Sequence, residues 1–208
     1  MRYSREHKQE THDRIVKKAS VRLREKGAHG IGVADLMKEA GLTHGGFYAH
    51  FDSREALVVE AFEYAMDRGM QHWRKITDQV APEKRLALMA DSYLSTLHRD
   101  NPGHGCSIPA LGAEIARESP KTRRAFAGKL DEMIEMIADY VPGVSRKAAR
   151  KQAIATLATM AGTMLLARIA ASSELSDEVL KVGRDTAIDG ARREPVKAVA
   201  KKSREKQS

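Results

Sequence analysis

The 208-residue sequence has one cysteine, Cys106, and only 5% aromatic residues. A single cysteine excludes a disulfide within the chain and a zinc site built from paired Cys-x-x-Cys motifs. The longest uncharged apolar run, residues 153–167, has 15 residues and is too short to span a bilayer. Residues 1–7 are polar and lack the apolar segment of a secretory signal. These absences predict a cytoplasmic protein with no membrane association.

Basic residues outnumber acidic residues, 36 to 28, and the excess lies at the two ends of the chain. Residues 1–51 hold 10 basic and 6 acidic side chains, and residues 192–208 hold 7 and 2, whereas the segment between them is nearly neutral. A basic N-terminal module favours a polyanionic partner such as nucleic acid. The alternative is a charge excess that only keeps the protein soluble.

Strand patterns are almost absent, and apolar residues recur at helical spacing through most of the chain. We therefore predict an all-α protein of about nine helices. Gly27 is expected to end the first helix, residues 33–40 to form the second, and Gly41 to break it. Thr43 is expected to cap a short helix that runs to about His50, and Ser53 to cap a long one.

Further helices are expected in the second part of the chain. Pro82 opens a helix that places Leu86, Met89, Tyr93 and Leu97 on one face, Ser119-Pro120 opens another, Ser145 starts one of about 28 residues, and Ser176 caps the last. The pattern divides the chain into residues 1–52, residues 53–194 and a basic tail, residues 195–208. The tail has no large apolar side chain, which predicts disorder.

Two short helices joined at Ala40-Gly41-Leu42-Thr43, after a basic helix, form the pattern of a helix-turn-helix. Gly41 permits the tight turn, and the small Ala40 lets the two helices touch. The pattern leaves the start of the second helix exposed, which is the end that enters a DNA major groove. The alternative is a generic helical hairpin with no partner.

Residues 33–43 and the run Gly45-Gly46-Phe47-Tyr48-Ala49-His50-Phe51-Asp52-Ser53-Arg54-Glu55-Ala56-Leu57 resemble the tetracycline-repressor (TetR) family of bacterial transcription regulators. The likeness covers roughly residues 10–60. The resemblance implies an N-terminal three-helix DNA-binding domain followed by a helical domain for effector binding and dimerisation. It also implies a set of DNA-contacting residues, which are Thr43, His44, Gly45, Gly46, Tyr48, His50 and Arg54.

Two consecutive glycines in the reading helix depart from the family pattern, because Gly46 replaces a usual Ser, Thr or Ala. Each glycine costs about 1 kcal/mol relative to alanine in a helix. Few side chains then remain to read bases. We infer either a close approach of the backbone to DNA or selectivity that rests on Thr43, His44 and DNA shape.

The resemblance implies an effector pocket among the middle helices, for which Trp73, Met89, Tyr93 and Cys106 are the candidate lining residues. Plain core packing is the alternative for each of them. Cys106 lies two residues after His104, and a nearby imidazolium would favour the thiolate that senses oxidants or electrophiles. A buried inert thiol and a metal site with histidines also fit Cys106. We predict no bound metal and no cofactor.

No constellation of residues supports catalysis, since Ser107, His104 and Glu114 have the residue types of a triad but no nucleophile elbow. The helix after Ser145 is rich in small residues and, with the last helix, resembles the dimer-forming pair of the family. The sequence therefore predicts a non-enzymatic, cytoplasmic homodimer that binds a palindromic DNA operator and is released by a small-molecule effector. The alternative function is a thiol-based sensor that uses Cys106.

Overall fold

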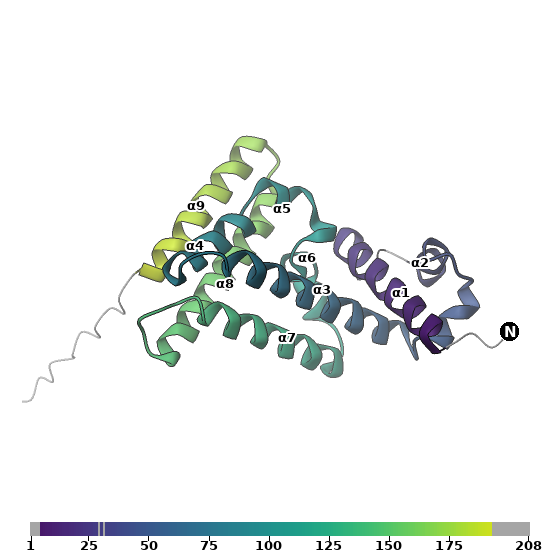
Figure 1. The fold of residues 1–208 in the computed structure, drawn as a ribbon. Coiled ribbons are helices and arrows are strands. Elements are labelled where there is room, and N and C mark those ends of the chain that lie inside the picture. Colours follow the sequence, from purple (N-terminus) through teal and green to yellow (C-terminus); the bar gives the residue numbers. More distant parts are fainter. Residues whose placement is uncertain (1–4, 29, 31, 193–208) are drawn as a thin grey trace, which may run out of the picture.

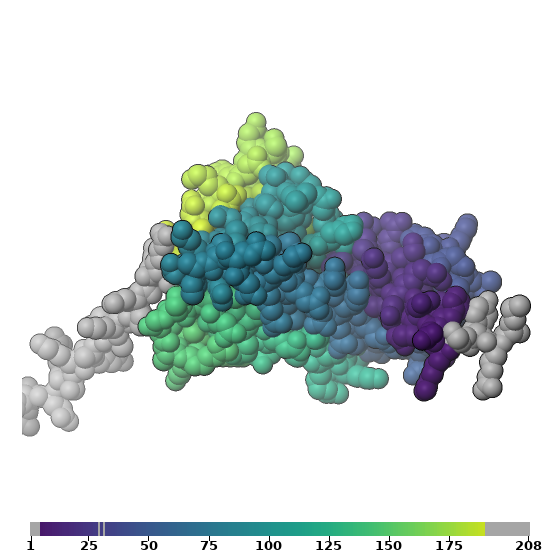
Figure 2. Space-filling view, viewed as in Figure 1, coloured from purple at the N-terminus to yellow at the C-terminus, as the bar shows by residue number. Residues whose placement is uncertain are grey.

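The computed structural model describes residues 5–28, 30 and 32–192, with side chains through residue 189. All regular structure in these residues is helical, with nine α-helices and two short 3-10 helices. The predicted all-α class is therefore confirmed. The basic tail expected at residues 195–208 lies outside the described residues. The N-terminal helices form one end of the molecule, and the last two helices lie at the other end (Figures 1 and 2).

The N-terminal helices enclose a small apolar core. They are α1 (Arg5–Lys26), α2 (Val33–Glu39), the 3-10 helix η1 (His44–Ala49) and the first turns of α3 (Arg54–Thr77). Ile15, Met37 and Phe47 are almost fully buried within this core. Gly27 and Gly41 have φ angles of 81° and 76°, which only glycine adopts without strain. Both glycines therefore end their helices as predicted.

The short helix after the turn differs from expectation in how it begins. Thr43 occupies the cap position with extended backbone, but its side chain makes no capping hydrogen bond. The Gly46 amide donates instead to the Thr43 carbonyl oxygen at 3.1 Å, in the i to i+3 pattern of a 3-10 helix. Thr43 is therefore the cap residue as predicted, but its hydroxyl does not accept the expected hydrogen bond, because the Gly46 amide is already bonded to the Thr43 carbonyl.

The long helix α3 runs from the N-terminal helices into the second part of the molecule (Figure 1), and it contributes side chains to two apolar cores. Its first turns contribute Leu57 and Ala61 to the N-terminal core, whereas Phe62 and Trp73 belong to the second core. Ser53 caps it as expected, with its hydroxyl accepting from the Ala56 amide at 3.0 Å. A tilt of α3 would therefore act on both cores. The division of the chain after residue 52 stays a proposal.

The helix expected to extend from Pro82 past Leu97 is interrupted. Helix α4 (Pro82–Tyr93) ends at Leu94, and the Ser95 hydroxyl then caps the short α5 (Thr96–Asp100) by accepting from the His98 amide. The break turns Leu97 away from the face that buries Leu86, and 75% of its surface is exposed. Contrary to the prediction, Leu97 is therefore not a core residue.

The remaining α-helices are α6 (Ser107–Ile115), α7 (Pro120–Ala138), α8 (Arg146–Ile169) and α9 (Ser173–Arg192), with the 3-10 turn η2 (Pro102–His104) before them. Ser119 and Ser145 cap α7 and α8 as expected. Helix α9 begins earlier than predicted, because the Ser172 hydroxyl accepts from the Leu175 amide. Ser176 is not its cap, and its hydroxyl donates to the Ala167 carbonyl at 2.8 Å. Helix α8 accordingly has 24 residues rather than about 28.

By length and composition, α8 passes the test for a membrane-crossing helix, with a mean hydropathy of 1.3 over its most apolar window. This is weak evidence, since core helices of globular proteins pass the same test. Helix α8 packs against α7 and α9, and its Ala153, Met160 and Met164 side chains are fully buried. The second core of the molecule lies on this side of the helix.

Candidate nucleic-acid interface and internal cavity

Helix η1 presents an exposed polar surface above the N-terminal core. Phe47 and Met37 are 1% and 0% exposed and support the helix from below. The Tyr48 side chain is 70% exposed and lies edge-on to the His44 ring. Five of the residues expected to contact DNA are thereby brought together on one surface, and they are Thr43, His44, Gly45, Gly46 and Tyr48.

The two glycines of η1 are not required by packing within the protein. A Cβ atom built on Gly45 meets nothing within 4 Å, and one built on Gly46 meets Met37 at 3.7 Å, which is an ordinary contact. Neither residue is among the glycines with positive φ. The free protein therefore has room for alanine at both positions, and the reason for glycine lies outside the described contacts.

His50 lies at the edge of this surface and is half-buried. Its ring lies beside Phe51 and His12, and its Nδ1 atom is buried with no hydrogen-bond partner among the described residues. Burial, together with the neighbouring His12 and Lys8, lowers the pKa of His50. The ring is therefore neutral at neutral pH in the free protein.

Arg54 is engaged within the protein rather than free at the surface. Its guanidinium donates a hydrogen bond to the Ala28 carbonyl in the turn after α1. The Ala28 amide in turn donates to the Glu114 carboxylate of α6 at 2.5 Å. A Cβ on Gly27 would lie 2.6 Å from the same carboxylate, so this contact, together with the φ of 81°, favours glycine there. Arg54 and Glu114 thus bind the carbonyl and the amide of the same residue, which belong to consecutive peptide groups.

This clamp was not predicted from the sequence. Glu114 is 86 residues from Ala28, and no local pattern indicates that they meet. The sequence signal at this position is Gly27, and its spacing predicts only the end of a helix. The clamp connects the N-terminal helices to α6 of the second part of the molecule. A phosphate contact by Arg54 stays a prediction.

A cavity of about 670 Å³ lies between α1, α3 and the segment from α4 to η2. Trp73, Tyr93 and Cys106 line it, as predicted for an effector pocket, whereas Met89 does not. Met89 is 0% exposed because it faces the second core from the buried side of α4. Helix α1 supplies one wall through Lys17, Ser20, Val21 and Arg24. The cavity therefore reaches the N-terminal unit, which the sequence did not indicate.

The cavity holds Cys106 in a setting that favours the neutral thiol. Burial raises the pKa of Cys106, an effect partly offset by the Tyr93 hydroxyl and by the charges of Arg24 and Arg168. His98 Nε2 accepts from the Cys106 amide at 2.9 Å, and Nδ1 lies 2.6 Å from the Tyr93 carbonyl. Burial lowers the pKa of His98 to about 4. The ring beside Cys106 is thus neutral, and no three-ligand metal cluster occurs in the described part of the chain.

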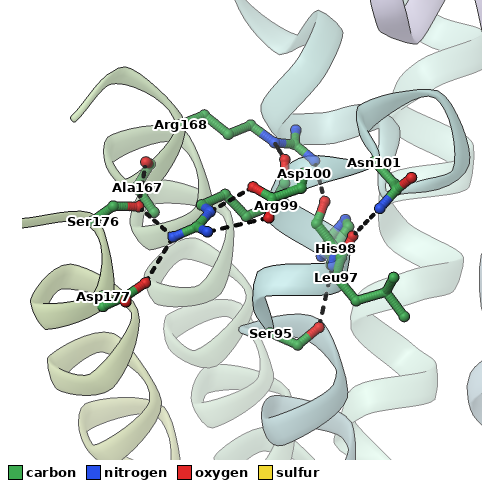
Figure 3. Close-up of polar contacts among 10 residues, drawn as sticks. All are labelled: Ser95, Leu97, His98, Arg99, Asp100, Asn101, Ala167, Arg168, Ser176 and Asp177. Carbon is green, nitrogen blue, oxygen red and sulfur yellow. Dashed lines mark hydrogen bonds and ion pairs between the residues drawn. The ribbon is translucent and has the colours of Figure 1, made fainter. Parts of the chain in front are cut away.

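Two arginines connect the cavity wall to the last helices (Figure 3). Arg168 of α8 donates to the carbonyl oxygens of His98 and Arg99 at 2.9 and 3.2 Å. Arg99 of α5 binds the Ser176 hydroxyl and the Asp177 carboxylate of α9 at 2.9 and 2.7 Å. A displacement of α5 would therefore act on α8 and α9 through these hydrogen bonds.

An exposed short helix supported by a three-helix core, joined to a helical domain with an internal cavity, defines a helix-turn-helix DNA-binding regulator. Residues 15–61 match the sequence profile of bacterial regulatory proteins of the tetR family. Residues 82–181 match the profile of the C-terminal domain of LmrA/YxaF-like transcriptional regulators. The chain belongs to the TetR family of transcription regulators, which confirms the resemblance seen in the sequence.

Similar proteins agree with this assignment. An uncharacterized HTH-type transcriptional regulator of Mycobacterium tuberculosis is 27% identical over 165 residues, which are 76% of this chain and 84% of that protein. A TetR regulator from Chloroflexus aurantiacus is 25% identical, with a TM-score of 0.70 over 87% of this chain and 96% of that one. Bacillus subtilis FadR, solved with stearoyl-CoA, shares the fold at 18% identity, with a TM-score of 0.61 over 86% and 98% of the two chains.

Proposed function

We propose that this TetR-family regulator is a repressor whose operator binding is released by a small molecule in the 670 Å³ cavity. The observation that carries the proposal is the position of α1, which packs against α3 and lines the cavity with Lys17 and Arg24. A ligand in the cavity touches a helix of the DNA-binding unit directly. That FadR, a protein of the same fold, holds stearoyl-CoA also supports a ligand site in this architecture.

The mechanism is a shift between two conformations. An effector that binds the non-operator conformation more tightly lowers operator affinity by the ratio of its two affinities. Displacement of α1 would act on the backbone of Ala28, whose carbonyl binds Arg54 and whose amide binds Glu114. It would also act on η1, because Phe47 and Ile15 share one core. The surface that carries Tyr48 then moves relative to its half-site.

We further propose that the protein is a cytoplasmic homodimer formed through α8 and α9. The outward faces of these helices expose large apolar side chains, including Ile154, Leu166, Ile169, Leu175 and Val182. Apolar patches of this kind mark association surfaces. A two-fold axis between such helix pairs produces a four-helix bundle and two reading surfaces. Two reading surfaces match a palindromic operator.

Genomic footprinting of the purified protein tests the central proposal. We expect discrete protected sites with wild-type protein and loss of protection with Tyr48→Ala and His44→Ala, because both side chains are exposed on η1. Leu130→Ala on α7 is a matched surface control that should protect the same sites. Uniform protection of all DNA, or equal protection by Tyr48→Ala, would contradict the proposal.

The thiol-based sensor stays a second candidate, and the cavity position of Cys106 is the observation that favours it. Its raised pKa and buried sulfur act against rapid oxidation. Cys106→Ser separates the two functions. A sensor that uses the thiol loses its response to oxidant in this variant and keeps operator binding, whereas an unchanged oxidant response would remove the candidate.

A further inference from the structure

The cavity is lined by cationic side chains without any acidic partner. Lys17, Arg24 and Arg68 line it, and no aspartate or glutamate is among its lining residues. Lys17 and Arg68 are exposed at the mouth, and Arg24 lies deeper and is half-buried. Three positive charges around one cavity produce a field that attracts anions and repels cations.

Arg24 is the most unusual of these cations, because the charge of the neighbouring Glu25 acts on it only weakly and it forms no ion pair with a described residue. One of its nitrogens donates to the Gly105 carbonyl at 3.0 Å, and its Nε atom is buried without a partner. No carboxylate of the described residues lies within ion-pair distance of it, whereas Arg22, two residues earlier, pairs with Glu25 and Glu39 at 3.0 and 2.8 Å.

Burial lowers the pKa of Arg24, as expected for a desolvated cation. Buried charges without partners are costly and are normally compensated by an opposite charge. The guanidinium also offers a planar set of donors that suits carboxylate and phosphate groups. An anionic group in the cavity would supply the missing partner.

The interior of the cavity is apolar. Met66, Trp73, Tyr93 and Met133 line it and are at most 6% exposed. Methionine side chains adapt to ligands of different shape, and aromatic rings provide large contact areas. A volume of about 670 Å³ lies within the range of small-molecule sites, about 300–1,000 Å³. The lining thus combines one polar, positive wall with an apolar floor.

We propose that the cavity binds an amphipathic organic anion, with its carboxylate or phosphate group on Arg24 and its apolar body against Trp73 and the two methionines. The inference rests on the proposed function, in that it assigns the chemical class of the effector. Because Arg24 belongs to α1 and also binds Gly105, the anionic group would act on the contact between the DNA-binding unit and the loop before α6.

Trp73 allows direct measurement, because it is the only tryptophan of the chain and lines the cavity. The probes are decanoate, decyl phosphate, 1-decanol and decylammonium, which share one chain and differ in the charged group. We expect both anions to change Trp73 fluorescence at concentrations at least about tenfold lower than decanol, with decylammonium weakest. The order of the two anions identifies a carboxylate or a phosphate site. Equal or tighter binding of decanol or decylammonium would overturn the proposal.

Substitution of Arg24 tests whether the anionic group binds to this side chain. Arg24→Met keeps the length and apolar stem of the side chain and should abolish the advantage of decanoate over decanol. Lys8→Met removes the same charge from α1 away from the cavity and should retain it. An anion preference that survives in Arg24→Met overturns the assignment. If Arg24→Met does not fold, Arg24→Lys serves, and we expect a reduced preference because one point charge replaces the guanidinium fork.

Failure of this inference differs from failure of the proposed function. Operator footprinting without any probe reports the regulator, and the decyl series reports the ligand class. Discrete footprints with no anion preference would overturn the ligand class alone. An anion preference that depends on Arg24, without discrete footprints, would support the ligand class and contradict the repressor.

Discussion

Replacement of Gly45 by alanine separates the stability of η1 from its approach to DNA. In the free protein a Cβ at this position meets no atom within 4 Å, and the backbone does not have the positive φ that favours glycine. Alanine is better than glycine in a helix by about 0.5–1 kcal/mol. Gly45→Ala should therefore raise the free energy of unfolding by up to about 1 kcal/mol, which is about 2–4 °C in Tm for a chain of this size.

Operator binding should change in the opposite direction. If the backbone at Gly45 approaches a phosphate or a base edge, a methyl group separates the two surfaces and breaks a hydrogen bond to a charged group. Such bonds contribute about 1.5–3 kcal/mol, so operator affinity should fall at least about tenfold. Urea denaturation measures the first effect, and fluorescence anisotropy with a footprinted duplex measures the second.

Gly128→Ala is the matched control. Gly128 is an exposed glycine of α7, and a Cβ there also meets nothing within 4 Å. It should stabilise the protein by a similar amount and leave operator affinity unchanged. Unchanged operator affinity in Gly45→Ala would refute the close approach and leave selectivity to side chains and DNA shape. Destabilisation by Gly45→Ala would refute the geometry of η1.

Three further predictions follow from burial and pairing. Ile169 is 69% exposed on α8, and Ile169→Glu should convert the proposed dimer into a monomer, as measured by light scattering. The control Leu130→Glu on α7 should leave the dimer intact. A dimeric Ile169→Glu variant would exclude the interface through α8 and α9. The His98 pKa lies at about 4 in the folded state and near 6.5 in the unfolded state. Because the unfolded chain binds the proton more readily, the contribution of neutral His98 to the free energy of unfolding is complete above pH 6.5. It should fall by up to about 3 kcal/mol towards pH 4. His98→Gln should flatten urea midpoints over that interval, and an equally steep loss would contradict the assignment. Tyr48→Ala should weaken operator binding and change the free energy of unfolding by no more than about 0.5 kcal/mol. Arg54→Ala should also lower the free energy of unfolding by about 1–2 kcal/mol, because the Ala28 carbonyl loses its donor. Equal stability of the two variants would argue against the hydrogen bond between Arg54 and Ala28.

The sequence by itself determined the helical class, the ends of α1 and α2 and the position of the reading helix. These features depend on local physical rules. Apolar residues recur at helical spacing, glycine occupies left-handed turns, and the exposed residues 43–45 lie just before the buried Phe47. Each rule involves residues within about one or two helical turns, so its signal is present in the linear chain. The same local rules misplaced the cap at Ser176, whose hydroxyl donates to the Ala167 carbonyl instead, and they predicted a side-chain bond at Thr43 that a backbone bond replaces.

Only the tertiary structure decided which residues connect the two parts of the chain. The backbone of Ala28 meets Arg54 of α3 and Glu114 of α6, and Arg24 reaches Gly105 across 81 residues of sequence. No periodicity specifies such pairs, because they depend on how whole helices pack. For the same reason composition indicated a basic N-terminal module but did not show that one of its arginines faces an internal cavity. The partial burial of that arginine without an ion pair is the basis of the proposed preference for an anion.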